Sequence, residues 1–328
     1  MHNKKVKISV IMPSYNVKEY ITQSIESVLN QTLDDIEVLC VDGGSDDGTL
    51  EILKKYSEED KRVHVYLSNK KSYGAQVNQG LTNANGEYIS IIETDDYIQE
   101  NMLESLYNLT QFGYIDIVKG NFYHMITSED ENLIKVDTAK QSIADYNKAF
   151  EIETNPIFLE GHPSIWAAIY KKSFLINNNI KFLEEKGGAW VDNPFFYETA
   201  IKAKTIIYTN TPYYYYRESN ENSSTNNLTN LSIPVKRIND IFNVLEENEF
   251  ENTEIRTLLY KRLFRYIEII IENNGNSQEN LDYETTKSIH NVLKKVDMKF
   301  VHENLSNKNK QIYFKFVSPL ILSKYENN

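Results

Sequence analysis

Strand-like and helical segments alternate along the first 120 residues, and this alternation constrains the fold more than any other feature. Apolar, β-branched runs predict strands at residues 6–12, 36–41, 63–66, 89–92 and 115–118. Segments of helical periodicity lie between and after them, at residues 17–30, 47–56, 74–83 and 99–109. We therefore expect an α/β fold, with a Rossmann-like, mostly parallel sheet flanked by helices.

The fourth predicted strand ends in three carboxylates within four positions. Residues 89–92 run directly into Glu93, Asp95 and Asp96. Acids this close repel one another and need a cation, a proton or water. Clustered oxygen ligands suit Mg²⁺ or Mn²⁺, which often take substrate phosphates as further ligands. The simpler alternative is that Asp95 or Asp96 caps the helix expected from about Gln99.

Two other predicted strands also end in polar or flexible residues. The first leads into residues 13–16, Pro-Ser-Tyr-Asn, and the second into residues 42–45, Asp-Gly-Gly-Ser. In parallel sheets, ligands bind at the carboxyl ends of the strands. If the three strands are parallel, all three exits open on one edge, which favours a ligand site over a helix cap.

Composition limits the classes of function. The formal net charge of −12 argues against a general nucleic-acid binder. We find no apolar run of about 18 residues and no signal peptide, so we expect no membrane span. The single cysteine, Cys40, fits a reducing compartment. We therefore expect a cytoplasmic protein. No Gly-x-Gly-x-x-Gly follows the first strand, which disfavours a nicotinamide-dependent enzyme.

Beyond residue 160 the predicted elements change in kind. Short strands are expected at residues 206–208 and 213–217, and a helix at 195–202. Residues 219–230 are rich in Asn and Ser, which indicates a loop or linker. Helical periodicity then predicts helices at residues 235–246, 254–273 and 279–296. Residues 308–324 are basic and apolar, which suits either an anionic membrane surface or packing on this helical appendage.

In order and spacing, these segments resemble the family 2 glycosyltransferases, which are inverting enzymes with the GT-A fold. The resemblance covers roughly the first two thirds of the chain. It rests on residues 10–16, 41–49, 78–80 with 84–88, and 93–96. Three later segments are similar to the branch that builds bacterial surface polysaccharides, namely residues 166–171, 192–196 and 215–217.

The resemblance implies a nucleotide-sugar donor and a divalent cation, Mn²⁺ or Mg²⁺. Residues 93–96 occupy the place of the family's metal-binding DxD motif, which implies Asp96 as the direct metal ligand and Asp95 near the ribose or sugar. Glu93 stands where many relatives have Asp; it is the second candidate metal ligand, and the alternative is that this longer carboxylate reaches only a hydroxyl. Tyr15 matches a position near the base, and an aromatic face suits a planar base. The alternative for Tyr15 is packing at a strand end. The full implied donor-binding set is Pro13, Tyr15, Asn16, Asp42, Gly44, Asn78 and Asp95.

Two positions depart from the family pattern. Many relatives carry an Asp where Gly43 stands, and that Asp binds uracil; here the neighbouring acid is Asp42. Many also carry an Arg where Val77 stands. Both departures concern the identity of the base, which is usually uracil, and neither concerns the metal.

Sugar transfer also needs a group that takes the proton of the acceptor hydroxyl. Asp192 is the candidate base, because it aligns with the acid of the family's catalytic segment and follows the flexible pair Gly187 and Gly188. The alternative is that Asp192 caps the helix expected from Phe195. Trp166 and Trp190 are candidates for stacking on sugars, although Trp is more often a core residue, and His162 is expected to be structural.

We thus expect residues 1–218 to form a GT-A nucleotide-sugar-binding and catalytic domain and residues 219–328 a helical C-terminal region. The predicted function is metal-dependent, inverting transfer of a sugar, with a UDP-sugar favoured as donor. The acceptor would be a glycan or lipid-linked glycan in capsule, lipopolysaccharide or other surface-polysaccharide assembly. The alternative is a degenerate domain that serves as a non-catalytic glycan-binding or scaffold subunit. The sequence is also compatible with homo-oligomerisation and with peripheral contact with the inner face of the plasma membrane.

Overall fold

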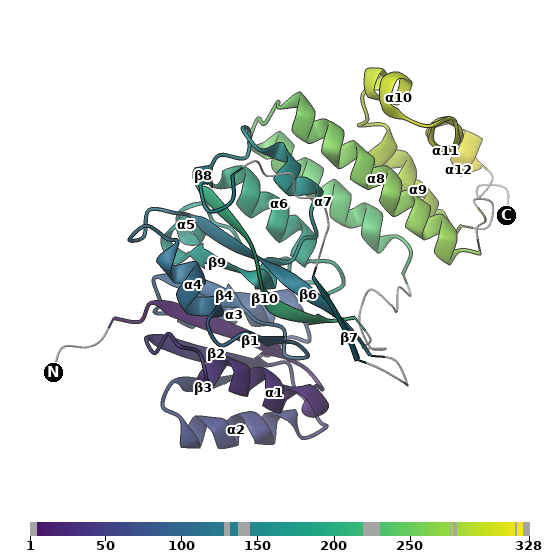
Figure 1. Cartoon of the computed structure of the whole chain (residues 1–328). Helices are drawn as coiled ribbons and strands as arrows, with labels where there is room; N and C mark the ends of the chain where they lie inside the picture. The colour runs from purple at the N-terminus through teal and green to yellow at the C-terminus, as the bar shows by residue number, and fades with distance from the viewer. Residues whose placement is uncertain are drawn as a thin grey trace. The chain divides into compact units, whose positions relative to one another are not determined.

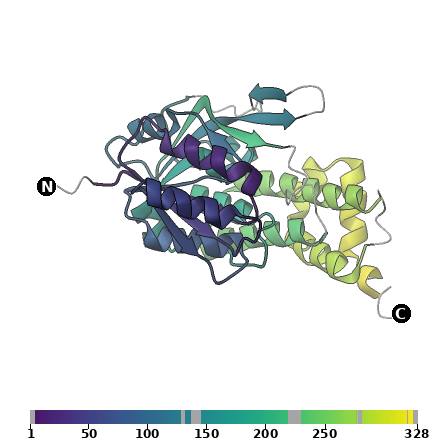
Figure 2. The ribbon, with the colours of Figure 1, turned by 90° about the horizontal axis from the view of Figure 1, so that it is seen from below.

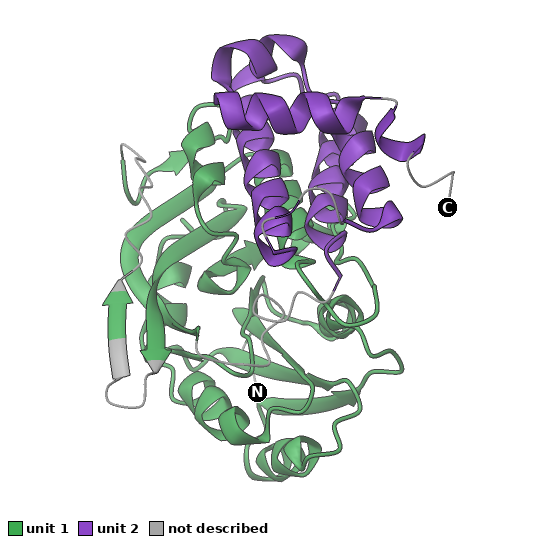
Figure 3. Ribbon diagram, turned by 90° about the vertical axis from the view of Figure 1, so that its right-hand side faces the viewer, with its two compact units in different colours: residues 1–223 green, residues 224–328 purple. Residues whose placement is uncertain are grey.

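The computed structural model describes residues 5–127, 132–136, 145–218, 230–275, 277, 281–318 and 320–323. The chain divides into two compact units, residues 1–223 and 224–328, which Figure 3 colours separately. The linker predicted at residues 219–230 lies, except for Asn230, outside the described residues.

Unit 1 is built on one mixed sheet with the strand order β3-β2-β1-β4-β9-β6-β10-β5 (Figure 1). Neighbours are parallel from β3 through β4, and β6 and β10 are also parallel, whereas β9 is antiparallel to β4 and β6. The predicted mostly parallel sheet is therefore confirmed. Its strands are β1 (Ile8–Ser14), β2 (Ile36–Asp42), β3 (Val63–Leu67), β4 (Tyr88–Ile91), β5 (Tyr97–Ile98), β6 (Ile117–Thr127), β9 (Ala168–Lys171) and β10 (Ile206–Arg217), with β7 (Asn132–Val136) on β6 and β8 (Ala149–Phe150) on β10.

Helices flank this sheet (Figures 1 and 2). The chain moves one way along the sheet from β1 to β3 and returns across it to β4, so right-handed crossovers place α1 and α2 on one face and α3 on the other. Burial on both faces explains why β1, β2 and β4 are buried throughout. The helices of this unit are α1 (Lys18–Leu29), α2 (Thr49–Glu59), α3 (Tyr73–Asn83), α4 (Met102–Asn108), α5 (Lys172–Asn177) and α6 (Asp192–Lys202), with 3₁₀ turns η1 (Pro156–Glu160) and η2 (Ile165–Ala167).

Several elements of unit 1 differ from the sequence-based expectation, and two of these differences involve β10. The strands predicted at residues 206–208 and 213–217 are one strand, β10, whose pairing with β6 shifts register between Tyr208 and Tyr214. The helix predicted from Gln99 starts later, because the short strand β5 pairs with β10 first. Such pairing depends on β10, far away in sequence, and no local pattern signals it.

Unit 2 consists of helices in the part that the structure describes. Side-chain oxygens of Asn252, Asp282, Asp297 and Ser306 cap the N-termini of α8 to α11. The cap at Asp282 starts α9 later than the predicted residue 279. The helices are α7 (Ile233–Glu247), α8 (Thr253–Asn273), α9 (Tyr283–Leu293), α10 (Met298–Asn304), α11 (Asn307–Val317) and α12 (Leu320–Ser323). Over the described residues of the whole chain, none of the helices combines the length and apolar character required to cross a bilayer.

Candidate active site

The three polar strand exits lie together. β2, β1 and β4 are adjacent and parallel, so their carboxyl ends share one edge of the sheet. Hydrogen bonds join the exits: Thr94 Oγ1 donates to Pro13 O (2.9 Å), and the Gly43 N–H donates to Ser14 O (2.8 Å). The side chain of Gln76, on α3, donates to the same Ser14 carbonyl (2.6 Å). These bonds fix the segment that carries Pro13 against both acidic segments.

The acids after β4 are held by groups from distant parts of the chain. Asp96 is 2% exposed; its Oδ2 accepts a hydrogen bond from the Tyr214 hydroxyl (2.8 Å) and its Oδ1 from the Arg217 N–H (2.7 Å). Glu93 accepts a hydrogen bond from the Tyr73 hydroxyl (2.5 Å). Asp95 and Asp96 do not cap a helix, because α4 begins only at Met102 with Asn101 as N-cap. The helix-cap alternative is therefore wrong.

Burial and mutual repulsion dominate the electrostatics of these acids. Burial raises the pKa of Glu93, the hydrogen bond from Tyr73 lowers it, and the charges of Asp95 and Asp192 raise it; together these effects bring the pKa to about 8. Burial, together with the charge of Asp95, also holds the pKa of Asp96 well above its usual range. Carboxylates in this state are stabilised by a nearby cation.

The donor set fits a hard divalent cation. Carboxylate oxygens are the ligands that Mg²⁺ and Mn²⁺ prefer. Among the described residues, no group of three or more His, Cys, Asp or Glu side chains forms a complete metal cage. One or two carboxylates, with substrate phosphates as the remaining ligands, is the usual arrangement for Mg²⁺. Asp96 and Glu93 can supply that pair.

Asp192 lies within electrostatic reach of Glu93. It is the first residue of α6, whose N-cap is Val191, and no side chain caps this helix. The cap alternative for Asp192 is therefore wrong as well. Asp192 Oδ1 accepts a hydrogen bond from Asn193 Nδ2 (3.2 Å), and the charge of Asp192 raises the pKa of Glu93. Trp190, just before it, has a φ of 61°, a value rare for a bulky residue, so the backbone leading into Asp192 is strained.

Tyr73 connects Glu93 to the loop before Asp192, and no sequence pattern indicates this role. Its hydroxyl donates to Glu93, while its backbone N–H donates to Gly187 O (2.7 Å). The Gly187 N–H in turn donates to Lys71 O (3.0 Å). A Cβ on Gly188 would lie 2.5 Å from the Tyr73 Cβ, so only glycine permits this approach. The glycine pair thus serves close packing against α3.

At the exit of β2, Asp42 is fully buried and bonds to its own turn. Its Oδ1 accepts hydrogen bonds from the backbone N–H groups of Gly44 and Ser45 (both 2.9 Å), and its Oδ2 accepts one from Ser45 Oγ (2.6 Å). Ser45 Oγ also accepts a hydrogen bond from the Asn16 N–H (3.0 Å). Asp42, Gly44 and Asn16 thus form one network at the sheet edge.

Tyr15 presents an open aromatic face at the first exit. Its side chain is 46% exposed, which argues against the packed alternative. The Lys71 ammonium lies 5.1 Å from the Tyr15 ring centroid and 3.3 Å from the hydroxyl. A cation over one ring face leaves an aromatic platform suited to a planar base.

The two departures from the family pattern are accommodated by packing. A Cβ on Gly43 would lie 2.8 Å from Gln76 Nε2, which also donates to Val41 O (2.9 Å). Gln76 therefore occupies the space into which a side chain at position 43 would project. Val77 is buried beside it.

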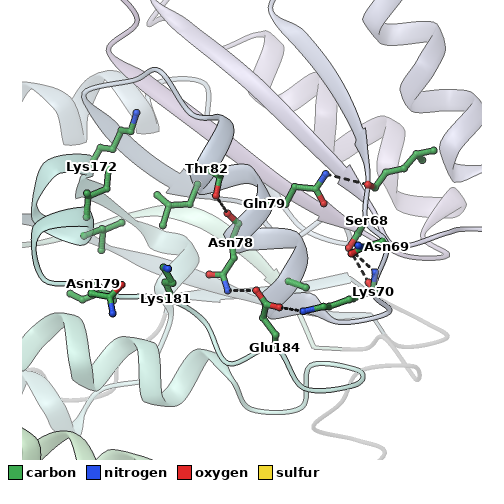
Figure 4. A pocket seen from close by; sticks show the side chains of 16 residues that line it. Ser68, Asn69, Lys70, Asn78, Gln79, Thr82, Lys172, Asn179, Lys181 and Glu184 are labelled. Atoms are coloured by element: carbon green, nitrogen blue, oxygen red, sulfur yellow. Dashed lines mark hydrogen bonds and ion pairs between the residues drawn. The ribbon is translucent and has the colours of Figure 1, made fainter.

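Two predicted residues lie apart from this arrangement. Asn78 lines a hollow to which none of the acids Asp42, Glu93, Asp95, Asp96 and Asp192 contributes (Figure 4). Trp166 is buried and stacks on Tyr214 at 4.1 Å and Tyr216 at 5.2 Å between ring centroids, so it packs behind Asp96 as a core residue. His162 packs among the same rings, as expected for a structural histidine.

Residues 9–166 match the family model described as Glycosyl transferase family 2. The chain is 41% identical over 123 residues to "Glycosyltransferase GlyG" of Streptococcus pneumoniae serotype 4, a stretch that covers 37% of this chain and 41% of GlyG. The chain therefore spans less than half the length of that relative.

Two solved structures share the fold. TarS from S. aureus in complex with UDP has a TM-score of 0.72 and 19% identity, covering 98% of this chain and 91% of that one. The mannosyltransferase PcManGT from Pyrobaculum calidifontis, in complex with GDP-Man and Mn²⁺, has a TM-score of 0.51 and 12% identity, covering 97% and 84%. The match of the family model identifies residues 9–166 as a family 2 glycosyltransferase domain, and the two solved structures share the GT-A fold.

Proposed function

We propose that this protein transfers a sugar from a nucleotide-sugar donor to a glycan or lipid-linked glycan acceptor in bacterial surface-polysaccharide assembly. The observation that carries the proposal is the pair of acids after β4, the buried Asp96 and the half-buried Glu93, with Asp192 within electrostatic reach of Glu93. The two carboxylates can bind a cation that holds the donor diphosphate, and Asp192 can accept the proton of an acceptor hydroxyl. Mutually repelling carboxylates with raised pKa values are characteristic of functional sites, which favours a transferase over a scaffold subunit.

In the proposed reaction, Asp192 accepts the proton of the acceptor hydroxyl as its oxygen attacks the anomeric carbon. The bond from that carbon to the donor phosphate breaks, and the nucleoside diphosphate leaves from the opposite face, which inverts the configuration. A divalent cation held by Asp96 and Glu93 would offset the charge of the leaving diphosphate. Tyr214 and Tyr73 keep the two carboxylates in place through their hydroxyls, and Asp95 contacts the ribose or the sugar.

We propose a UDP-sugar as the donor. The Tyr15 platform supports a planar base, and TarS, the neighbour with the higher TM-score, was solved with UDP. PcManGT was solved with GDP-Man and Mn²⁺, which supports the use of a divalent cation and makes guanine the alternative to uracil as the base. The remaining proposed donor contacts are those of Pro13, Asn16, Asp42 and Gly44 at the same edge. Asn78 was also predicted to bind the donor, but it lines the separate hollow beside α3.

A thermal-shift screen of nucleotide sugars, with and without Mn²⁺, tests this function. We expect a UDP-sugar to raise the melting temperature, and Mn²⁺ to be required for the full shift, because bound ligand stabilises the folded state. No shift with any nucleotide sugar in the presence of Mn²⁺ would overturn the proposal in favour of the non-catalytic scaffold.

We also propose peripheral contact of the C-terminal helices with an anionic membrane. Ile312 and Phe316 of α11 are buried, and Phe316 O accepts a hydrogen bond from His290 Nδ1 (2.7 Å). Phe314 is 51% exposed and Leu320 76% exposed, on a lysine-rich segment. Co-sedimentation with phosphatidylserine vesicles should fall when Phe314 and Leu320 are both changed to Ser. A wild-type protein that ignores these vesicles would show that the segment serves packing alone.

A further inference from the structure

A polar hollow of about 760 Å³ lies in unit 1 beside α3, and none of the proposed metal-binding or catalytic acids lines it (Figure 4). Its walls come from the end of β3 and the residues after it, from α3, and from α5 and the segment that follows. The residues on which the inference depends are Lys70, Asn78, Gln79, Lys172, Lys181 and Glu184.

The hollow is locally basic in an acidic protein. Three lysines and one glutamate line it, a local charge of +2, whereas the whole chain carries −12. Glu184 accepts hydrogen bonds from Lys70 and from Asn78 Nδ2 (3.0 Å), and these bonds lower its pKa. The Lys172 ammonium donates to the Ala84 carbonyl. Lys181 is exposed, and its ammonium has no hydrogen bond or ion pair to any other residue in the described part of the chain.

The neutral lining suits sugars rather than a nucleotide base. Side-chain amides of Asn69, Gln79 and Asn179 line the hollow, and amides can both donate to and accept from sugar hydroxyls. The exposed side chains of Leu67 and Ile176 add apolar surface. None of the lining residues is aromatic, so the hollow offers no platform on which a base could stack.

The wall of the hollow continues into the loop before Asp192. Asn78 Nδ2 donates to Phe182 O (2.9 Å), and Asn78 Oδ1 accepts from the Phe182 N–H (2.9 Å), which fixes the segment that carries Glu184. A few residues later the same segment reaches Gly187, which is bonded to the residues before α3.

The residues before α3 connect the hollow to the donor side. Lys70 reaches Glu184 in the hollow, whereas the next residue, Lys71, reaches the Tyr15 ring. Two adjacent residues, Lys70 and Lys71, therefore link the hollow to the proposed base-binding side chain Tyr15.

We propose that this hollow binds an anionic part of the glycan acceptor, a sugar chain that carries phosphate groups, away from the reacting hydroxyl. The inference rests on the proposed transferase function, which it extends by naming the acceptor's chemical class. Lysines supply charge-assisted hydrogen bonds to phosphate oxygens, and the amides contact the sugar hydroxyls.

The test measures binding by fluorescence anisotropy on the full chain, with a labelled, phosphorylated dextran oligosaccharide and the neutral dextran of equal length. Lys181→Glu is the test variant. Lys204→Glu, the same charge change at an exposed lysine outside the hollow, is its matched control. No donor or metal is present, so the assay measures binding in the hollow even if the protein has no transferase activity. A negative result here would not change the interpretation of the thermal-shift screen.

We expect the phosphorylated dextran to bind, the neutral dextran to bind at least tenfold more weakly, and Lys181→Glu to lose roughly tenfold in affinity, the scale of one hydrogen bond to a charged group. Lys204→Glu should bind like wild type, and both variants should melt like it. Equal binding of the two dextrans, equal losses in the two variants, or no binding at all would overturn the proposal. Competition by inorganic phosphate as effective as by the phosphorylated glycan, phosphate for phosphate, would also overturn it, because the hollow would then select a free anion.

Discussion

The exits of β2 and β4 carry acids at the same edge of the sheet, yet the structure uses them differently. The Asp42 carboxylate accepts hydrogen bonds only from the two residues of its own turn, Gly44 and Ser45, among the contacts described above. Asp96 and Glu93 are bonded by groups on β10 and α3, far away in sequence.

Asp42 therefore stabilises its own loop, whereas the fold holds Glu93 and Asp96 where their charged forms are unfavourable. Burial and neighbouring charges raise the pKa values of Glu93 and Asp96. Perturbed acids of this kind are characteristic of functional sites, although ion-pair networks also produce them. We therefore expect changes after β4 to affect chemistry and changes after β2 to affect stability.

Removal of divalent metal should have the largest effect, and it acts on the β4 side alone. With excess EDTA, sugar transfer should fall to background and return when Mn²⁺ or Mg²⁺ is added, because the leaving diphosphate loses its charge stabilisation. Transfer is measured by release of nucleoside diphosphate that depends on acceptor. Full turnover in EDTA would show that the acids after β4 do not act through a metal, and the proposed functional difference between the exits of β2 and β4 would be wrong.

Asp192→Asn should reduce the rate of transfer by about 10²–10⁴-fold, since an amide cannot take the proton of the acceptor hydroxyl. Because Asp192 is not the N-cap of α6, this variant should melt close to wild type and bind donor and metal normally. Rates of transfer and melting curves are compared. Near-normal transfer by this variant would show that Asp192 is not the base, and Glu184, Glu185 and Glu198 would be the next acids to test.

Asp42→Ala should lower the free energy of unfolding by about 1–3 kcal/mol, because the turn after β2 loses its buried acceptor. Asp96→Asn is the matched variant on the other exit. It removes a buried charge from a repelling cluster and should be at least as stable as wild type, but inactive. Urea unfolding measures both, and a greater loss of stability in Asp96→Asn than in Asp42→Ala would reverse the comparison.

The smallest effect concerns the base. UDP should bind more tightly than GDP, but by a smaller margin than in relatives with an acid at position 43, because Tyr15 offers stacking and the Asp42 carboxylate bonds to its own turn. Calorimetric titration with both nucleotides in Mn²⁺ gives the margin. Equal or tighter binding of GDP would show that the uracil assignment is wrong.

The sequence predicted where the acids lie better than what holds them. The apolar runs that form β1, β2 and β4, and the acids after them, are local patterns, so the shared edge followed from parallel pairing alone. Tyr73, Tyr214 and Gln76 contact the site only because distant elements fold against it, and one sequence carries no sign of such contacts. For the same reason β5 and the continuous β10 were missed.

The packing of Gln76 against Gly43 has an evolutionary consequence. The Gln76 amide joins the exits of β1 and β2 through Ser14 O and Val41 O, and it fills the space next to the Gly43 Cα. A lineage that acquired an acid at position 43 would also have to shorten or redirect residue 76, and would lose the two hydrogen bonds of Gln76. Selection should therefore act on positions 43 and 76 together rather than on either one alone.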